Sequence, residues 1–233
     1  MDDSREQSVV MVMDISQMVG DSFEYAKDGL VGKWSKWILL IISCIIFPLI
    51  MGYMMRIYRG ETPAPEPDNW GEMFIDGIKL FIVGLIYAIP AFIIGFVLFL
   101  STMLALFAAM AAPPVNPNAV MGLIGANIFV YLIFFLVVII IGLISATAVV
   151  RFARTNRFGE AFNFGAIFDH ITKIGLVPYI IALIVMGIVI GVVELICELI
   201  PYVGFILLLI ISPFLVLFHA RYLCKLFDSA GTA

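Results

Sequence analysis

The stretch "LFIVGLIYAIPAFIIGFVLFLSTMLALFAAM" (residues 80–110) opens a run of 71 residues, Leu80 to Val150, that contains no Asp, Glu, Lys or Arg. The whole chain of 233 residues is 63% hydrophobic and only 13% charged, with a mean hydropathy of +1.13. A soluble domain has roughly 45–50% apolar and about 25% charged residues. Because one core of this size cannot hide such a surplus, the sequence predicts an integral membrane protein.

The apolar runs divide into helical hairpins. A crossing needs about 20 residues, since a helix rises about 1.5 Å per residue and the hydrocarbon core is about 30 Å thick. Residues 80–150 therefore form two helices joined by "AAPPVNPNAV" (residues 111–120), with tilting or a break expected near Pro90. Residues 174–220 divide in the same way at "CELIPYVG" (residues 197–204). Because lipid leaves no backbone group unpaired, we expect an all-α bundle with four spanning helices.

The positions of the basic residues predict the orientation. The chain has 13 lysines and arginines, and none lies in either hairpin tip. By the positive-inside rule both tips face outward, and both chain termini are cytoplasmic.

The first apolar run, residues 37–55, has basic residues at both ends and is only 19 residues long. We expect it to be a short re-entrant hairpin that turns near Pro48, because this topology keeps all the basic residues inside. The alternative is a fifth span with an exported N-terminus.

Two segments are amphipathic and are predicted to lie in the membrane surface, residues 69–79 and 157–173. Residues 21–34 are a weaker third candidate. Residues 1–36 would then form a cytoplasmic N-terminal segment, 37–225 a single membrane domain and 226–233 a tail. The order of surface helix, hairpin and basic exit also suggests a degenerate internal repeat.

The stretch "GYMMRIYRGETPAPEPDNWGEMFIDGIKLFIVGLIYAIP" (residues 52–90) resembles the signature of a prokaryotic membrane-protein family called domain of unknown function 4013. The resemblance is specific over these 39 residues and extends, at the level of hairpins, over about residues 21–226. It implies a polytopic helical membrane protein of no known activity, so no catalytic residue is carried over. The matching positions are Gly52, Tyr53, Arg56, Gly60, Glu61, Pro65, Trp70, Gly71, Phe74, Asp76, Gly77, Tyr87 and Pro90.

An acidic pair, Glu194 and Glu198, lies within the third run. Residues four apart share one helical face, so the pair is a candidate proton or cation site. The alternative is that headgroup water solvates both carboxylates near the helix end.

Several predicted cytoplasmic arginines are candidate contacts for lipid headgroups or a partner. The alternative is that they only set the topology. They are Arg56, Arg59, Arg151, Arg154 and Arg221.

No catalytic, cofactor or metal site is predicted. Cys44, Cys197 and Cys224 lack the CxxC spacing and would lie at different depths, and His170 and His219 are too few for a metal centre.

Our leading interpretation is a non-catalytic structural or accessory protein of the cytoplasmic membrane, which scaffolds a membrane complex or shapes the bilayer. Its expected partners are membrane lipids and a membrane protein or a second copy, with no nucleic acid and no cofactor. One alternative is a small transporter or channel that uses Glu194 and Glu198. Another is a lipid-modifying enzyme that uses Glu160, Asp169 or His170.

Overall fold

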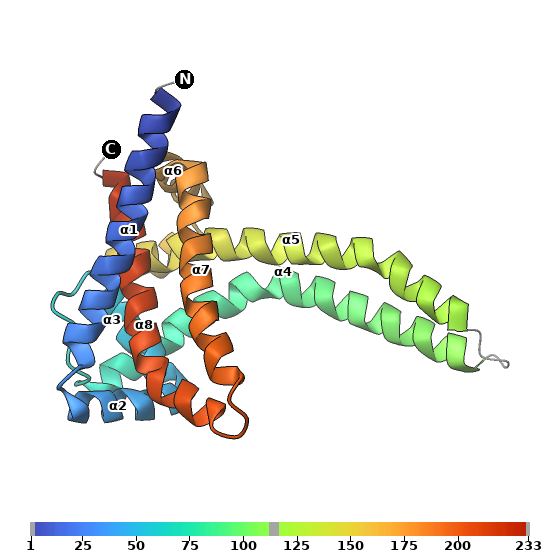
Figure 1. Ribbon diagram of the computed structural model, residues 1–233, viewed down its shortest axis with the longest axis horizontal. Coiled ribbons are helices and arrows are strands. Elements are labelled where there is room, and N and C mark those ends of the chain that lie inside the picture. Colours follow the sequence, from blue (N-terminus) through green and yellow to red (C-terminus); the bar gives the residue numbers. More distant parts are fainter. Residues whose placement is uncertain (1–2, 112–116, 232–233) are drawn as a thin grey trace. The chain divides into compact units, whose positions relative to one another are not determined.

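The computed structural model describes residues 3–111 and 117–231, with side chains for all of these except residues 3–14, 117–120, 123–124 and 126–127. All regular structure in the described ranges is helical, which confirms the predicted all-α class (Figure 1). Two short 3-10 helices, Phe158–Phe162 and Ser229–Gly231, accompany the α-helices. The α-helices are α1 (Asp3–Leu30), α2 (Trp34–Ile45), α3 (Phe47–Tyr58), α4 (Trp70–Ala111), α5 (Pro117–Thr155), α6 (Phe164–Ile174), α7 (Leu176–Glu198) and α8 (Gly204–Asp228).

Within the described ranges, four helices are long and apolar enough to cross a membrane. They are α4, α5 from Ile128 onward, α7 and α8. Their length and apolar composition suggest a membrane protein with four candidate spans, in agreement with the sequence-based expectation. A turn containing Pro201 separates α7 from α8.

The chain divides into two compact units, which we call the core unit (Met1–Val83 with Ala146–Ala233) and the hairpin unit (Gly84–Ser145). The hairpin unit consists of the apolar parts of α4 and α5. Thr102 Oγ1 of one arm lies 3.0 Å from the hydroxyl oxygen of Tyr131 on the other. Helix α4 continues through Pro90 without interruption, and the predicted connection at residues 111–120 falls mostly outside the described residues.

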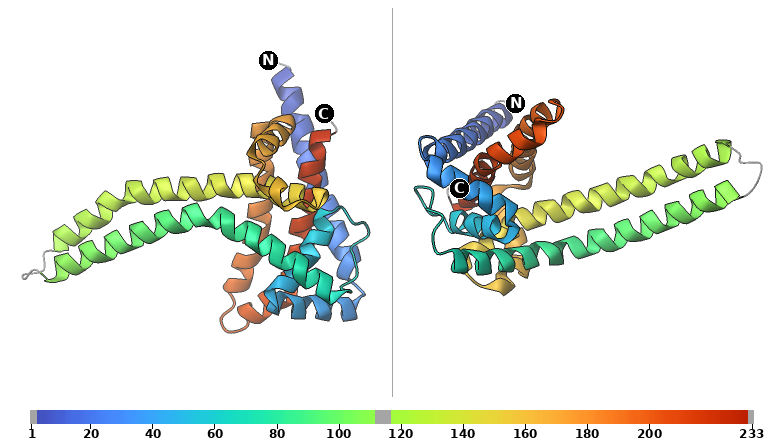
Figure 2. Two further views of the ribbon diagram at one scale, coloured as in Figure 1. Left: turned by 180° about the vertical axis from the view of Figure 1, so that it is seen from behind. Right: turned by 90° about the horizontal axis from the view of Figure 1, so that it is seen from below.

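The core unit is assembled around α8, which contacts α1, α2, α3 and α7. Helix α1 lies beside α8, as Figure 2 shows from two directions. The two helices are antiparallel, because Asp21 pairs with Lys225 and the Tyr25 ring with Arg221. Large side chains that are fully buried in this unit include Leu30, Leu40, Tyr53, Ile57, Leu217 and Tyr222.

The first apolar run is interrupted, because α2 ends at Ile45 and α3 begins at Phe47. Ile46 between them has φ −91° and ψ 79°, which is not helical. Pro48 lies in the first turn of α3, where its missing N–H needs no partner and its fixed φ suits a helix start. The chain therefore changes direction one or two residues before the predicted turn at Pro48.

Helices α3 and α4 approach each other so closely that their backbones touch. A Cβ added to Gly52 would lie 1.7 Å from Met73 O, and one added to Gly77 would lie 1.7 Å from Pro48 O. Only glycine fits at either position. These contacts resemble the small-residue seams that let helices in membranes pack backbone to backbone.

Several helix boundaries differ from the sequence-based expectation. Residues 69–79 are not a separate helix, because α4 runs unbroken from Trp70 and nothing near Lys79 interrupts its hydrogen bonding. Helix α1 begins well before residue 21. Residues 157–173 divide into a 3-10 helix and α6, since the Asn163 side chain accepts a hydrogen bond of 3.3 Å from Ala166 N and starts a new helix.

We predict that Gly52→Ala and Gly77→Ala each destabilise the protein, because the new methyl group would push α3 and α4 apart. Overpacking costs about 1–3 kcal/mol in ordinary cores, and a collision with backbone lies at the upper end. Thermal unfolding in detergent measures the effect. Gly71→Ala is the matched control, since its Cβ would meet no atom within 4 Å. Equal unfolding temperatures for all three variants would contradict the close approach.

Candidate functional site

The arginines singled out from the sequence are mostly bound within the chain. Arg56 is buried, and its Nη1 lies 2.6 Å from Asp68 Oδ1 and donates to Glu66 O at 2.9 Å. Its Nη2 donates to the backbone oxygen of Asp68 at 3.0 Å. Arg59 pairs with Asp76 at 2.5 Å. The Arg56 guanidinium therefore binds the connection between α3 and α4, and Arg59 at the end of α3 binds α4 itself.

The same connection, residues 59–69, is fixed by further side chains. Lys36 Nζ donates to Ala64 O at 2.8 Å and to Glu66 Oε1 at 3.2 Å. Burial lowers the pKa of Lys36, although the Glu66 carboxylate acts in the opposite direction. The hydroxyl of the fully buried Tyr53 donates to Pro65 O at 2.8 Å. The connection is thus bound to both α2 and α3.

Arg151 binds Glu160, with distances of 2.9 Å from Nε and 2.6 Å from Nη2 to Glu160 Oε2. The hydrogen bond from Arg151 holds the pKa of Glu160 below its ordinary value. Asn163 Nδ2 also donates to this carboxylate at 3.3 Å. These bonds fasten the 3-10 helix to the end of α5.

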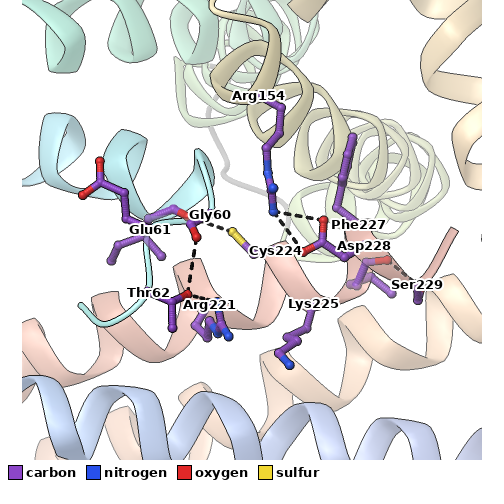
Figure 3. Close-up of polar contacts among 12 residues, drawn as sticks. Gly60, Glu61, Thr62, Arg154, Arg221, Cys224, Lys225, Phe227, Asp228 and Ser229 are labelled. Atoms are coloured by element: carbon purple, nitrogen blue, oxygen red, sulfur yellow. Dashed lines mark hydrogen bonds and ion pairs between the residues drawn. The ribbon is translucent and has the colours of Figure 1, made fainter. Parts of the chain in front are cut away.

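Two other arginines, Arg154 and Arg221, lie on either side of Cys224, as Figure 3 shows. Arg154 Nη2 lies 2.9 Å from each carboxylate oxygen of Asp228. The Cys224 thiol donates to Ile57 O at 3.1 Å and so joins α8 to the end of α3. We call Arg154, Arg221, Thr62, Cys224 and Asp228 the basic cluster.

Arg221 differs from the other four arginines, because it makes no ion pair with a carboxylate among the described residues. Its Nη1 donates to Thr62 Oγ1 at 3.1 Å, and this contact is exposed. Its Cζ lies 4.8 Å from the centre of the Tyr25 ring, which is a cation–π contact. Its Nε is buried and has no hydrogen-bond partner in the described part of the chain.

A tight turn at Gly60 forms one wall of the basic cluster. Gly60 has φ +93°, a conformation that favours glycine, and a Cβ there would lie 2.7 Å from Arg154 Nη1. Thr62 Oγ1 donates to Gly60 O at 3.3 Å. The Tyr25 hydroxyl donates to Glu61 O at 2.9 Å and ties the turn to α1.

The acidic pair Glu194 and Glu198 lies in the last two turns of α7, and both side chains are exposed. The described residues contain no group of three or more His, Cys, Asp or Glu arranged to hold a metal ion. The structure therefore brings no third acidic or histidine ligand to this pair.

The residues of the enzymatic alternative are held in separate contacts. Asp169 pairs with Lys173 at 2.9 Å, one turn later on α6. His170 Nε2 donates to Phe227 O at 2.9 Å, and the two rings stack with centroids 3.8 Å apart. Glu160 is bound by Arg151 instead of facing His170.

Sequence reasoning missed Tyr25, which contacts Arg221, and Thr62 and Asp228, which belong to the basic cluster. They come from α1, a loop and the C-terminal end of α8, far apart in the sequence. No spacing rule relates them. The pairs Asp76–Lys79 and Asp169–Lys173, at i,i+3 and i,i+4, are the ion pairs that the sequence alone could have shown.

The described part of the chain is all-helical, and its four candidate spans suggest a membrane protein. Residues 37–202 match the family described as "Protein of unknown function (DUF4013)". This match covers more than half of the chain, so the protein belongs to this family, as the signature at residues 52–90 predicts. Comparisons with curated proteins and with solved structures found no match.

We predict that His170 makes the stability of the protein depend on pH. Burial lowers the pKa of His170 from its ordinary value of 6.5, so the folded state disfavours the charged ring. The contribution of His170 is complete above pH 6.5 and is lost as the pH falls toward the lower pKa of the folded state. The thermal midpoint should therefore fall between pH 7 and pH 5, and fall less in His170→Gln, which does not titrate.

The titration of Glu160 and Asp169 does not interfere with this measurement. Their pKa values are also lowered, from ordinary values of 4.5 and 3.8, so their effects lie at more acidic pH. Parallel pH profiles for the wild type and His170→Gln would contradict the prediction.

Proposed function

We propose that the protein is a non-catalytic structural or accessory protein of the cytoplasmic membrane, and that it scaffolds a membrane complex through its hairpin unit. The apolar surface of this unit is the observation that supports the proposal. Large side chains along both arms are more than half exposed, and they include Phe92, Phe99, Phe107, Phe129 and Phe135. The charged side chains of the core unit mostly bind one another instead.

The length of the hairpin strengthens this proposal. The uncharged part of α4, Leu80–Ala111, has 32 residues and is about 48 Å long. Even at a tilt of about 40° such a helix covers about 37 Å, whereas the hydrocarbon core measures about 30 Å. The hairpin therefore thickens the bilayer around it or extends beyond it, and an apolar extension needs a partner to cover it.

The polar groups of the hairpin support a hairpin that extends beyond the bilayer. Leu80–Leu100 is 21 residues, about 32 Å, and is followed by Ser101 and Thr102. Tyr131 hydrogen-bonds Thr102 across the hairpin, and tyrosine is enriched at membrane boundaries. The position of Ser101, Thr102 and Tyr131 along the hairpin suits the outer surface of the membrane. The part of each arm beyond it would be the scaffolding surface.

The proposal includes a topology with four spans and both termini in the cytoplasm. The helix break at Ile46 suits a re-entrant α2–α3 hairpin. The exposed Phe164 and Phe168 of α6 suit a helix in the membrane surface. We keep the internal repeat as part of the proposal, although the surface segment before the first long hairpin is the start of α4 and not a separate helix.

We predict that gentle extraction from native membranes yields the protein with a second membrane polypeptide at fixed stoichiometry, measured by native mass spectrometry. Phe107→Asn should reduce the amount of this partner, because it places an amide on the proposed scaffolding surface. Phe205→Asn is the matched control. Phe205 is 78% exposed and Phe107 75% exposed, but Phe205 lies at the start of α8 in the core unit.

A partner that is retained equally by both variants would show that the hairpin is not the scaffolding surface. A homo-oligomer alone, with ion flux in vesicles that disappears in Glu194→Gln and Glu198→Gln, would replace the proposal with the transporter alternative.

A further inference from the structure

We propose that the basic cluster binds a phosphate group, and that Arg221 is its principal ligand. An anionic phospholipid headgroup or free phosphate carries this chemistry. The inference identifies the lipid partner of the proposed function, and it rests on that function only in placing the chain in a membrane.

Arg221 differs from the other described basic side chains, because it is partly buried and has no ion pair with a described residue. The unpaired ones other than Arg221 are exposed to solvent, where water stabilises their charge: Lys27, Lys33 and Arg157. Arg221 is half-buried, lies between Tyr25 of α1 and Thr62 of the loop after Gly60, and has no carboxylate partner in the described residues. A partly desolvated cation is costly unless an anion compensates it. The remaining basic residues are ion-paired: Lys36, Arg56, Arg59, Lys79, Arg151, Arg154, Lys173 and Lys225.

The geometry of the basic cluster fits an anion with several oxygen atoms. Nη1 of Arg221 and Oγ1 of Thr62 form an exposed pair, and Arg154 and Asp228 form a second exposed pair across Cys224 (Figure 3). Two guanidinium groups and one carboxylate leave a net charge of plus one. Arginine forks match phosphate oxygens in a bidentate manner, and the Thr62 hydroxyl can rotate to donate a further hydrogen bond.

The position of Arg221 along α8 suits a headgroup. It lies 17 residues after Gly204, so about 26 Å along the helix axis from the α7–α8 turn. A hydrocarbon core of about 30 Å that begins near this turn ends close to Arg221. Lys225, one turn later, lies at the same end of α8 and is ion-paired with Asp21.

The test is a titration of the full-length protein, in a neutral maltoside detergent, with phosphatidylglycerol, phosphatidylcholine and inorganic phosphate. Bound lipid is counted by native mass spectrometry. We expect phosphatidylglycerol to bind, and Arg221→Gln to weaken this binding about tenfold or more, as the loss of a charge-assisted hydrogen bond does. Arg157→Gln, which removes the same charge from an exposed arginine, should change it less than about twofold.

The probes distinguish the two sources of phosphate. Displacement of phosphatidylglycerol by inorganic phosphate, lost in Arg221→Gln, would support the site with free phosphate as its ligand. Retention of phosphatidylglycerol under the same conditions would support a lipid ligand. Equal binding of phosphatidylglycerol by Arg221→Gln and Arg157→Gln would overturn the proposal.

Two milder variants keep the test decisive if Arg221→Gln does not fold. Arg221→Lys keeps the charge but loses the fork, and Thr62→Val loses the hydroxyl, so each should weaken binding by about threefold or more. Unchanged binding in both folded variants would overturn the site. The protein partner is measured separately, by extraction from native membranes. If the Arg221 variants show that there is no phosphate site but the partner still co-purifies, the proposed accessory role stands.

Discussion

The core unit depends on the packing of its other helices around α8. The ion pair of Lys225 with Asp21 joins α8 to α1, and the thiol of Cys224 joins it to α3. The Tyr222 hydroxyl donates to Ala182 O of α7 at 2.9 Å, and the Trp37 indole of α2 donates to Ile210 O at 2.8 Å. In the most apolar 18-residue stretch of α8, a third of the residues are buried within the chain, whereas none are buried in the corresponding stretch of α5. Helix α8 is therefore shielded by protein on several sides.

The signature residues of the family have structural roles in this chain. Gly52 and Gly77 allow α3 and α4 to touch, Tyr53 and Arg56 bind carbonyl groups of the connection, and Asp76 accepts from Arg59 and Lys79. The connection in turn forms the wall of the basic cluster, since Gly60 and Thr62 follow α3 directly. The signature residues thus stabilise the contact between α3 and α4, and they affect the basic cluster only indirectly, through the connection.

The fold class and the four long apolar helices could be predicted from the sequence, because lipid burial requires uncharged runs of defined length. The boundary at Lys79 could not, since three charges in the first turns of α4 resemble a separate amphipathic helix although nothing breaks the backbone there. The role of the arginines was hidden for a different reason. Arg56 and Arg59 meet Asp68 and Asp76 only because α3 folds back on α4, and no local spacing reveals such a pair. That Arg221 has no carboxylate partner in the described residues can be recognised only once the partners of the other charged side chains are known.

Carbodiimide cross-linking in native membranes tests whether α1 is joined to α8 by the ion pair of Asp21 with Lys225. The reagent forms an amide between a lysine and a carboxylate that are already in contact. We expect an amide between Asp21 and Lys225, whose side chains are 49% and 33% exposed, found by mass spectrometry of the linked peptides. The more exposed pair of Asp169 and Lys173 within α6 is the internal control. A sample in which the control pair links and Asp21 stays unlinked to Lys225 would show that this ion pair does not join α1 to α8.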